Sequence, residues 1–177
     1  GLDDQKVIEI CSFTNKLGLV EAVNFNSPGQ VVIAGNKKAV ENACKLMKEA
    51  GAKRALVLPV SVPSHCSLMK DAAMNFKHSV DEIDFQMGVK KVIHNVDADY
   101  SSNIEEIKSK LVEQIYKPVL WTSTVQKMKG LGTEKLIEAG PGKVLTGLTR
   151  RIDKSLSGSA IIDVITLKST IEEISNA

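Results

Sequence analysis

The order of elements expected in residues 1–60 constrains the fold more than any other feature of the sequence. Hydrophobic spacing and turn residues predict, in order, a helix at 3–17, strands VEAVNFN (20–26) and QVVIAG (30–35), a helix capped by Asn36 and stopped by Gly51, and a strand RALVLPV (54–60). This order is typical of a ferredoxin-like, or split βαβ, unit without its first strand. We therefore expect an α/β chain whose residues 1–60 form a truncated ferredoxin-like small subdomain.

A tight turn between the first two strands supports this interpretation. SPGQ places Pro28 second and Gly29 third, the position of a type II turn that needs a positive φ. The strand missing from the unit normally lies inside the sheet, and without it backbone groups would be left unpaired. The sequence thus predicts that the chain begins in the middle of a domain.

The remaining residues, 61–177, alternate between expected helices and strands, which implies a largely parallel sheet. Ser102 and Glu105 are expected to form a capping box, and Ser169 with Glu172 to open the last helix. The predicted helices are 67–80, 101–116, a segment from Pro118 to about Lys129, one entered by a turn within PGKVLTGLTRRI (141–152), and the last one. The predicted strands are KVIHNV (91–96), EKLIEAG (134–140) and AIIDVI (160–165). We treat residues 61–177 as a second region.

Composition excludes several classes of protein. A net charge of +2 and 4% aromatic residues give no basis for nucleic-acid binding. No apolar run approaches the ~18 residues of a membrane helix, and the acidic N-terminus is unlike a signal peptide. The three cysteines form no CxxC, which favours reduced thiols and a cytoplasmic location, with Cys11 and Cys44 packed in the core.

The segment PVSVPSHCSLM (59–69) contains the most suggestive side chain, His65. A histidine between a proline-rich loop and a helix serves as a general base, a metal ligand or a capping group. His78 and His94 have no ligand-like spacing to it, so no metal site is expected. Cys66 is adjacent, but neighbouring residues point in different directions, and a nucleophile usually meets its base from a distant part of the chain. We expect Cys66 to be a packed thiol.

Two further motifs have simple structural explanations. EAGPGKVLTG (138–147) lacks the first glycine and the Ser or Thr of a phosphate-binding loop, which favours a tight turn into a helix. Arg150 and Arg151 come late in that helix, where they favour the macrodipole or meet an acidic partner. No GxSxG occurs, so the sequence marks no serine nucleophile.

Taken together, several segments resemble the C-terminal half of the bacterial malonyl-CoA:acyl carrier protein transacylase family. They run in the family's order over nearly the whole chain: VNFNSPGQVVIAG, AGAKRAL, PVSVPSHCSLM, NVD, KPVLW and GPGKVLTGLTRRI. The resemblance implies an α/β-hydrolase-like large subdomain, represented by 61–177, with the ferredoxin-like small subdomain inserted into it. It also implies malonyl-CoA and acyl carrier protein as partners, in fatty acid biosynthesis, with no cofactor, nucleic acid or membrane.

The resemblance further implies a ping-pong transfer in which a serine is acylated by malonyl-CoA. His65 corresponds to the general acid and base, and Gln114 to the position whose carbonyl holds its Nδ1–H. Asn26 and Arg54 are expected to contact substrate, and Arg150 with Arg151 to attract the acidic carrier protein.

The sequence also departs from the family pattern, because the GHSxG serine, the malonate-binding arginine and the oxyanion hole have no counterpart in it. Without them the chain alone is expected to be inactive. Two alternatives remain open: a non-catalytic acyltransferase-like module that binds acyl carrier protein or CoA, and an acyltransferase domain of a polyketide synthase.

Overall fold

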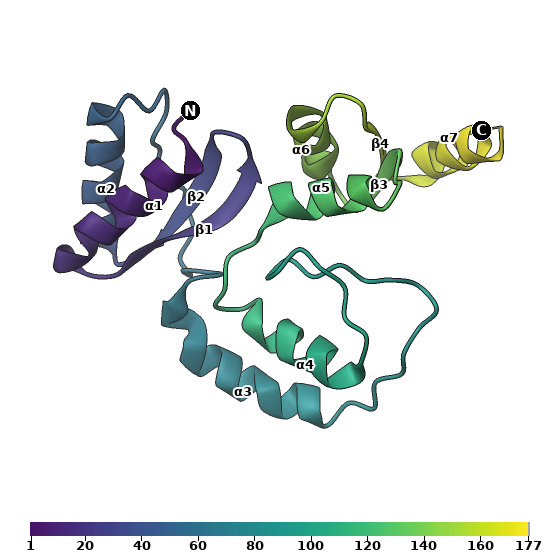
Figure 1. Ribbon diagram of the computed structural model, residues 1–177, viewed down its shortest axis with the longest axis horizontal. Coiled ribbons are helices and arrows are strands. Elements are labelled where there is room, and N and C mark those ends of the chain that lie inside the picture. Colours follow the sequence, from purple (N-terminus) through teal and green to yellow (C-terminus); the bar gives the residue numbers. More distant parts are fainter. Residues whose placement is uncertain (177) are drawn as a thin grey trace. The chain divides into compact units, whose positions relative to one another are not determined.

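The structure, a computed structural model, describes residues 1–176 and divides into two compact units, Gly1–Thr124 and Val125–Ala177 (Figure 1). The boundary expected after residue 60 lies inside the first unit and stays a prediction; Ala177, the last residue of the second predicted region, lies outside the described residues. None of the helices in the described part of the chain is long and apolar enough to cross a membrane.

The first unit begins with two helices packed on a two-stranded hairpin (Figure 1). The elements are α1 (Asp4–Thr14), a 3-10 turn (Asn15–Leu17), β1 (Val20–Ser27), β2 (Gln30–Gly35) and α2 (Lys37–Glu49). Their apolar faces form one core, which comprises Val7, Ile10, Cys11, Val20, Ala22, Ala39, Ala43 and Met47. The predicted helices and hairpin are therefore confirmed. Each has one apolar face, and packing these faces against one another removes them from water.

The hairpin turn also matches the expectation. Gly29 has a φ of 72°, and Ser27 pairs with Gln30 across the turn. Two register shifts interrupt β1, between Ala22 and Asn24 and between Phe25 and Ser27. At this irregular stretch Val119 joins β1 as a short parallel bridge, with bonds Phe25 N–H to Val119 O (2.9 Å) and Val119 N–H to Val23 O (2.9 Å).

Two expected strands are wrong. Residues 54–60 form no strand in the described structure, and Leu56, Val57 and Val60 are 72, 67 and 67% exposed. Residues 91–96 make a single bridge, Ile93 to Tyr100. Both segments have strand-like composition, but a strand exists only where a neighbour accepts and donates its backbone bonds.

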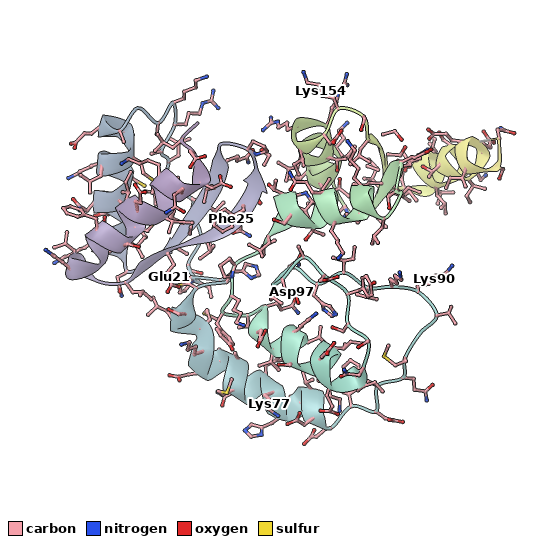
Figure 2. All side chains as sticks on the ribbon, in the orientation of Figure 1. Glu21, Phe25, Lys77, Lys90, Asp97 and Lys154 are labelled. Carbon is pink, nitrogen blue, oxygen red and sulfur yellow. The ribbon has the colours of Figure 1, made fainter. Side chains whose placement is uncertain are left out.

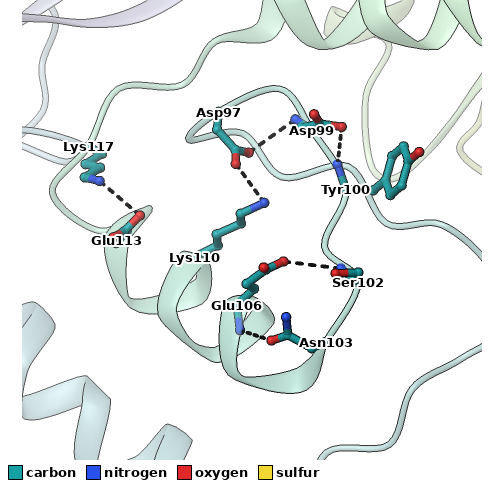
Figure 3. Close-up of polar contacts among 9 residues, drawn as sticks. All are labelled: Asp97, Asp99, Tyr100, Ser102, Asn103, Glu106, Lys110, Glu113 and Lys117. Atoms are coloured by element: carbon teal, nitrogen blue, oxygen red, sulfur yellow. Dashed lines mark hydrogen bonds and ion pairs between the residues drawn. The ribbon is translucent and has the colours of Figure 1, made fainter.

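After the hairpin and α2, the first unit continues with a pair of packed helices. A 3-10 turn (Ser67–Met69) leads into α3 (Lys70–Asp81), which packs on α4 (Ile104–Glu113) through Ala73, Val80 and Val112. The expected capping box at Ser102 is wrong by one residue. Asn103 caps α4 by accepting from Glu106 N–H (2.9 Å), and the Glu106 carboxylate accepts from Ser102 N–H at 3.3 Å (Figure 3). Asn103 is preferred because its side chain, placed one residue before the helix, reaches the third helical N–H.

The second unit is a compact βαβ arrangement. Its elements are most of α5 (Trp121–Gly130), then β3 (Lys135–Ala139), α6 (Val144–Ile152), β4 (Ser157–Ile161) and α7 (Val164–Ser175). β3 and β4 pair in parallel, whereas β1 and β2 are antiparallel. The parallel pairing expected for residues 61–177 is therefore confirmed for β3 and β4, although the sheet that they form within the described residues has only two strands.

Side-chain caps explain where the last helices begin. Asp163 and Thr166 form a capping box, so α7 starts at Val164 and not at Ser169, and β4 ends before the expected strand would. At α6, the Glu138 carboxylate accepts from Thr146 N–H (2.7 Å) and Thr146 Oγ1 (2.8 Å). At α2, Asn36 does occupy the capping position, but its amide oxygen accepts from Leu19 N–H (2.8 Å) instead of capping the helix.

Candidate active site

The candidate site centres on the backbone of His65, which has an unusual conformation. Its φ is +64°, a left-handed value that a non-glycine residue adopts at a cost of about 1–3 kcal/mol unless its surroundings hold it. The His65 N–H donates to the carbonyl of Ile115 at 3.0 Å, just beyond the end of α4. A contact from a segment distant in the sequence therefore helps to hold this conformation.

The imidazole makes a second contact with the same segment. His65 Nδ1 lies 2.6 Å from the main-chain carbonyl oxygen of Gln114, the residue that follows α4. Carbonyls at the end of a helix lack helical partners and are available to side chains. Because a carbonyl oxygen only accepts, Nδ1 carries the proton, and in the neutral ring Nε2 is left with its lone pair. The half-buried imidazole is thus oriented as a base.

A carboxylate from β1 holds the residues that follow His65. Glu21 accepts two bonds from Ser67, from its N–H at 2.7 Å and from its Oγ at 2.8 Å, across 46 residues of sequence. Figure 2 shows Glu21 between β1 and the start of α3. Burial alone would raise the pKa of the Glu21 carboxyl, but the Ser67 bonds, aided by the positive charge of Lys70, lower it below the usual range. Glu21 is therefore ionised at neutral pH.

Cys66 does not act as a nucleophile in this arrangement. Its side chain is fully buried, and burial raises the pKa of the thiol, with a further contribution from its bond to Glu21. Only a thiolate is strongly nucleophilic, so the structure supports a packed thiol at this position. Cys11 is similarly placed, since burial raises its pKa to about 11.

We expect the thiols to react slowly in the folded protein. With iodoacetamide at pH 8, mass spectrometry should find little alkylation of Cys11 and Cys66, whereas all three cysteines should be labelled in denaturant, because burial raises the thiol pKa and blocks access. Cys44, which is only half-buried, should react before the other two. Rapid labelling of Cys66 in the native protein would contradict its assignment as a packed thiol.

Comparison with known proteins shows which proteins this chain resembles. No family model matches the chain. The malonyl CoA-acyl carrier protein transacylase of Escherichia coli K12 is 49% identical over 172 residues, which are 97% of this chain and 56% of the relative. The Bacillus subtilis transacylase is 40% identical over 175 residues, 98% of this chain and 55% of the relative.

The chain is a homologue of the malonyl CoA-acyl carrier protein transacylases. It aligns with their C-terminal part and spans about half the length of these curated relatives. Among solved structures, an acyl carrier protein S-malonyltransferase from Vibrio cholerae matches with a TM-score of 0.93 at 53% identity, covering 96% of this chain and 56% of that one. These matches confirm the predicted α/β acyltransferase fold.

A second solved structure is informative about partners. A malonyl-transacylase determined in complex with a type II polyketide acyl carrier protein matches with a TM-score of 0.95 at 47% identity, covering 98% of this chain and 56% of that chain. That transacylase binds a carrier protein.

The other expected site residues of this transacylase homologue occupy different surroundings. Asn26 lies half-buried at the second irregularity of β1, and Arg54 is exposed in the irregular segment after α2. Among the contacts made within residues 1–176, none joins either side chain to His65. Arg150 and Arg151 are exposed in the last turn of α6, in the second unit. Their roles stay predictions.

Sequence reasoning missed two members of the site, Glu21 and the carbonyl of Ile115. A backbone carbonyl leaves no signal in a sequence, because every residue carries one. Glu21 did leave one: it is the sole charged residue of β1, placed among residues that are buried or half-buried. In the described part of the chain, no three His, Cys, Asp or Glu side chains gather in a way that could hold a metal ion.

Proposed function

We propose that the complete protein containing this chain transfers a malonyl group from malonyl-CoA to the pantetheine thiol of an acyl carrier protein, in fatty acid biosynthesis. The observation that carries the proposal is the 2.6 Å contact between His65 Nδ1 and the Gln114 carbonyl, in a chain homologous to malonyl-CoA transacylases. This contact leaves Nε2 as the basic nitrogen of the ring.

In the proposed reaction, Nε2 of His65 takes the proton of a serine hydroxyl as that oxygen attacks the malonyl thioester. The imidazolium then returns the proton to the departing CoA thiol, which leaves a malonyl-serine ester. In the second half, Nε2 takes the proton of the pantetheine thiol, the sulfur attacks the ester, and the serine leaves with the proton. The chain has no GxSxG, so the serine comes from another segment of the complete protein.

A carbonyl partner suits this substrate better than a carboxylate partner would. Both would fix the tautomer and orientation of the ring, but a carboxylate would add a negative charge close to the negatively charged malonate. The Gln114 carbonyl orients His65 without that repulsion.

The remaining expected residues are proposed as binding groups. Asn26 would contact the substrate, and the exposed Arg54 the phosphates of CoA. The exposed Arg150 and Arg151 would attract an acidic carrier protein. The carrier-protein complex of a similar transacylase supports this choice of partner, and it also keeps a carrier protein of polyketide synthesis as an alternative. The reaction needs no cofactor, and the unpaired thiols support a cytoplasmic location.

Intact-mass spectrometry tests the proposed function directly. The complete protein incubated with malonyl-CoA should gain a stable adduct of ~86 Da, one malonyl group as a serine ester, and should lose it when carrier protein is added. This chain by itself should gain none, because it has no serine elbow. A complete protein that binds malonyl-CoA or carrier protein without ever forming the adduct would instead be the non-catalytic module.

A further inference from the structure

The His65 loop is held on both sides of its strained residue. On one side, the end of α4 receives two contacts from His65, through its backbone N–H and its Nδ1. On the other side, Glu21 holds Ser67, two residues after His65, and the intervening Cys66 is fully buried. The end of α4 therefore contacts the imidazole directly, whereas Glu21 contacts only Ser67 and acts on His65 through the backbone.

We propose that Glu21 is a positioning residue for His65, and that its carboxylate maintains the left-handed backbone that aims the imidazole at Gln114. A residue at φ +64° relaxes towards negative φ when its neighbours are free, because most side chains are more stable there. Such a rotation would swing the Cα–Cβ bond and draw Nδ1 away from the Gln114 carbonyl. Two bonds from one carboxylate to Ser67 oppose it, one to the backbone and one to the side chain.

The chemistry of the contact favours a carboxylate over a neutral acceptor. An ionised acceptor forms shorter and stronger bonds than an amide does, as the distances of 2.7 and 2.8 Å indicate. The Ser67 N–H also belongs to the first turn leading into α3, where backbone donors lack helical partners and favour a negative charge. Of the charged groups near Glu21, Lys70 is a cation that further favours its ionised form.

The effect on catalysis rests on the proposed function, whereas the effect on the imidazole does not. We therefore suggest two readouts in the complete protein: histidine ¹⁵N NMR, which reports which ring nitrogen of His65 carries the proton, and the kinetics of malonyl transfer. Glu21→Ala should replace the single Nδ1–H tautomer with the mixture found for free imidazole. It should lower kcat about 10- to 100-fold with little change in KM, since a misplacement of about 1 Å can have an effect of this size.

Three comparison variants make the test specific. Glu21→Gln retains an acceptor for the Ser67 N–H and should restore much of the wild-type tautomer and rate. Ser67→Ala removes only the Oγ bond and should fall between wild type and Glu21→Ala, which keeps the test available if the latter does not fold. Glu138→Ala removes an equivalent pair of bonds elsewhere, from Thr146 of α6 to Glu138 of β3, and should leave the His65 resonances at their wild-type positions.

The outcomes separate this proposal from the proposed function. A wild-type His65 spectrum in Glu21→Ala would overturn the positioning role. So would a loss of the Nδ1–H signal in Glu138→Ala as large as that in Glu21→Ala. Loss of the Nδ1–H signal in Glu21→Ala would support it even if His65→Ala retained transfer, a result that would remove His65 from the mechanism and leave its anchoring intact.

Discussion

Replacing His65 with alanine in the complete protein should slow malonyl transfer about a thousandfold, since a positioned general base contributes about 10²- to 10⁴-fold. Both half-reactions should be affected, because the same Nε2 takes a proton from the serine and later from the pantetheine thiol. Single-turnover measurement of the malonyl-enzyme by mass spectrometry would check the first step, and transfer to carrier protein the second.

His78→Ala provides a matched control for this measurement. His78 lies exposed on α3, and we expect the variant to transfer malonyl at the wild-type rate. Thermal unfolding of His65→Ala should remain close to wild type, because the half-buried ring contributes little to the core. If His65→Ala kept its wild-type rate, the histidine would have no place in the mechanism.

Replacing Gly35 with alanine should destabilise the protein by roughly 2–4 kcal/mol, through a strained backbone and an overfilled site. Gly35 has a φ of +156° at the end of β2, and a methyl group there would lie 2.7 Å from Val20 Cα and closer still to the Leu19 carbonyl oxygen. That oxygen accepts the Asn36 N–H at 2.8 Å, so the methyl group would disrupt the link between the hairpin and α2. Urea unfolding of the two proteins gives the difference directly.

Gly130→Ala is the control for the Gly35 measurement. Gly130 ends α5, and a methyl group added there would meet no atom within 4 Å. Alanine is also the better helix former, so the free energy of unfolding should change by less than about 1 kcal/mol. Equal destabilisation by the two substitutions would show that the close approach at Gly35 is not the cause.

Helix and strand positions could be predicted where local chemistry decides them. The hairpin over 20–35 was predicted correctly because the Pro28–Gly29 turn and its apolar flanks leave few alternatives. Residues 54–60 and 91–96 were wrongly predicted as strands because strand composition is local, whereas a sheet partner is not. The same limit applies to the caps of α4 and α7, where neighbouring polar residues compete and only the backbone geometry selects Asn103 and Asp163.

In the candidate site, too, some features could be predicted from local sequence and others depend on tertiary contacts. His65 stood out in the sequence, and the resemblance to a transacylase family supplied Gln114 as its partner. The structure brings these two residues, 49 apart in sequence, to a distance of 2.6 Å. It also adds Glu21, whose role depends on a bond across 46 residues that no local pattern encodes.

The sequence by itself determined which residue types were available: a histidine after a proline-rich loop, three cysteines without a metal-binding spacing, and no serine elbow. Tertiary structure alone decided what those residues do. Contacts with Gln114 and Ile115 favour one tautomer and one backbone conformation of His65, and burial keeps Cys66 a thiol. The physical reason is that orientation and pKa depend on groups within a few ångströms in space, and the fold draws these groups from distant parts of the chain.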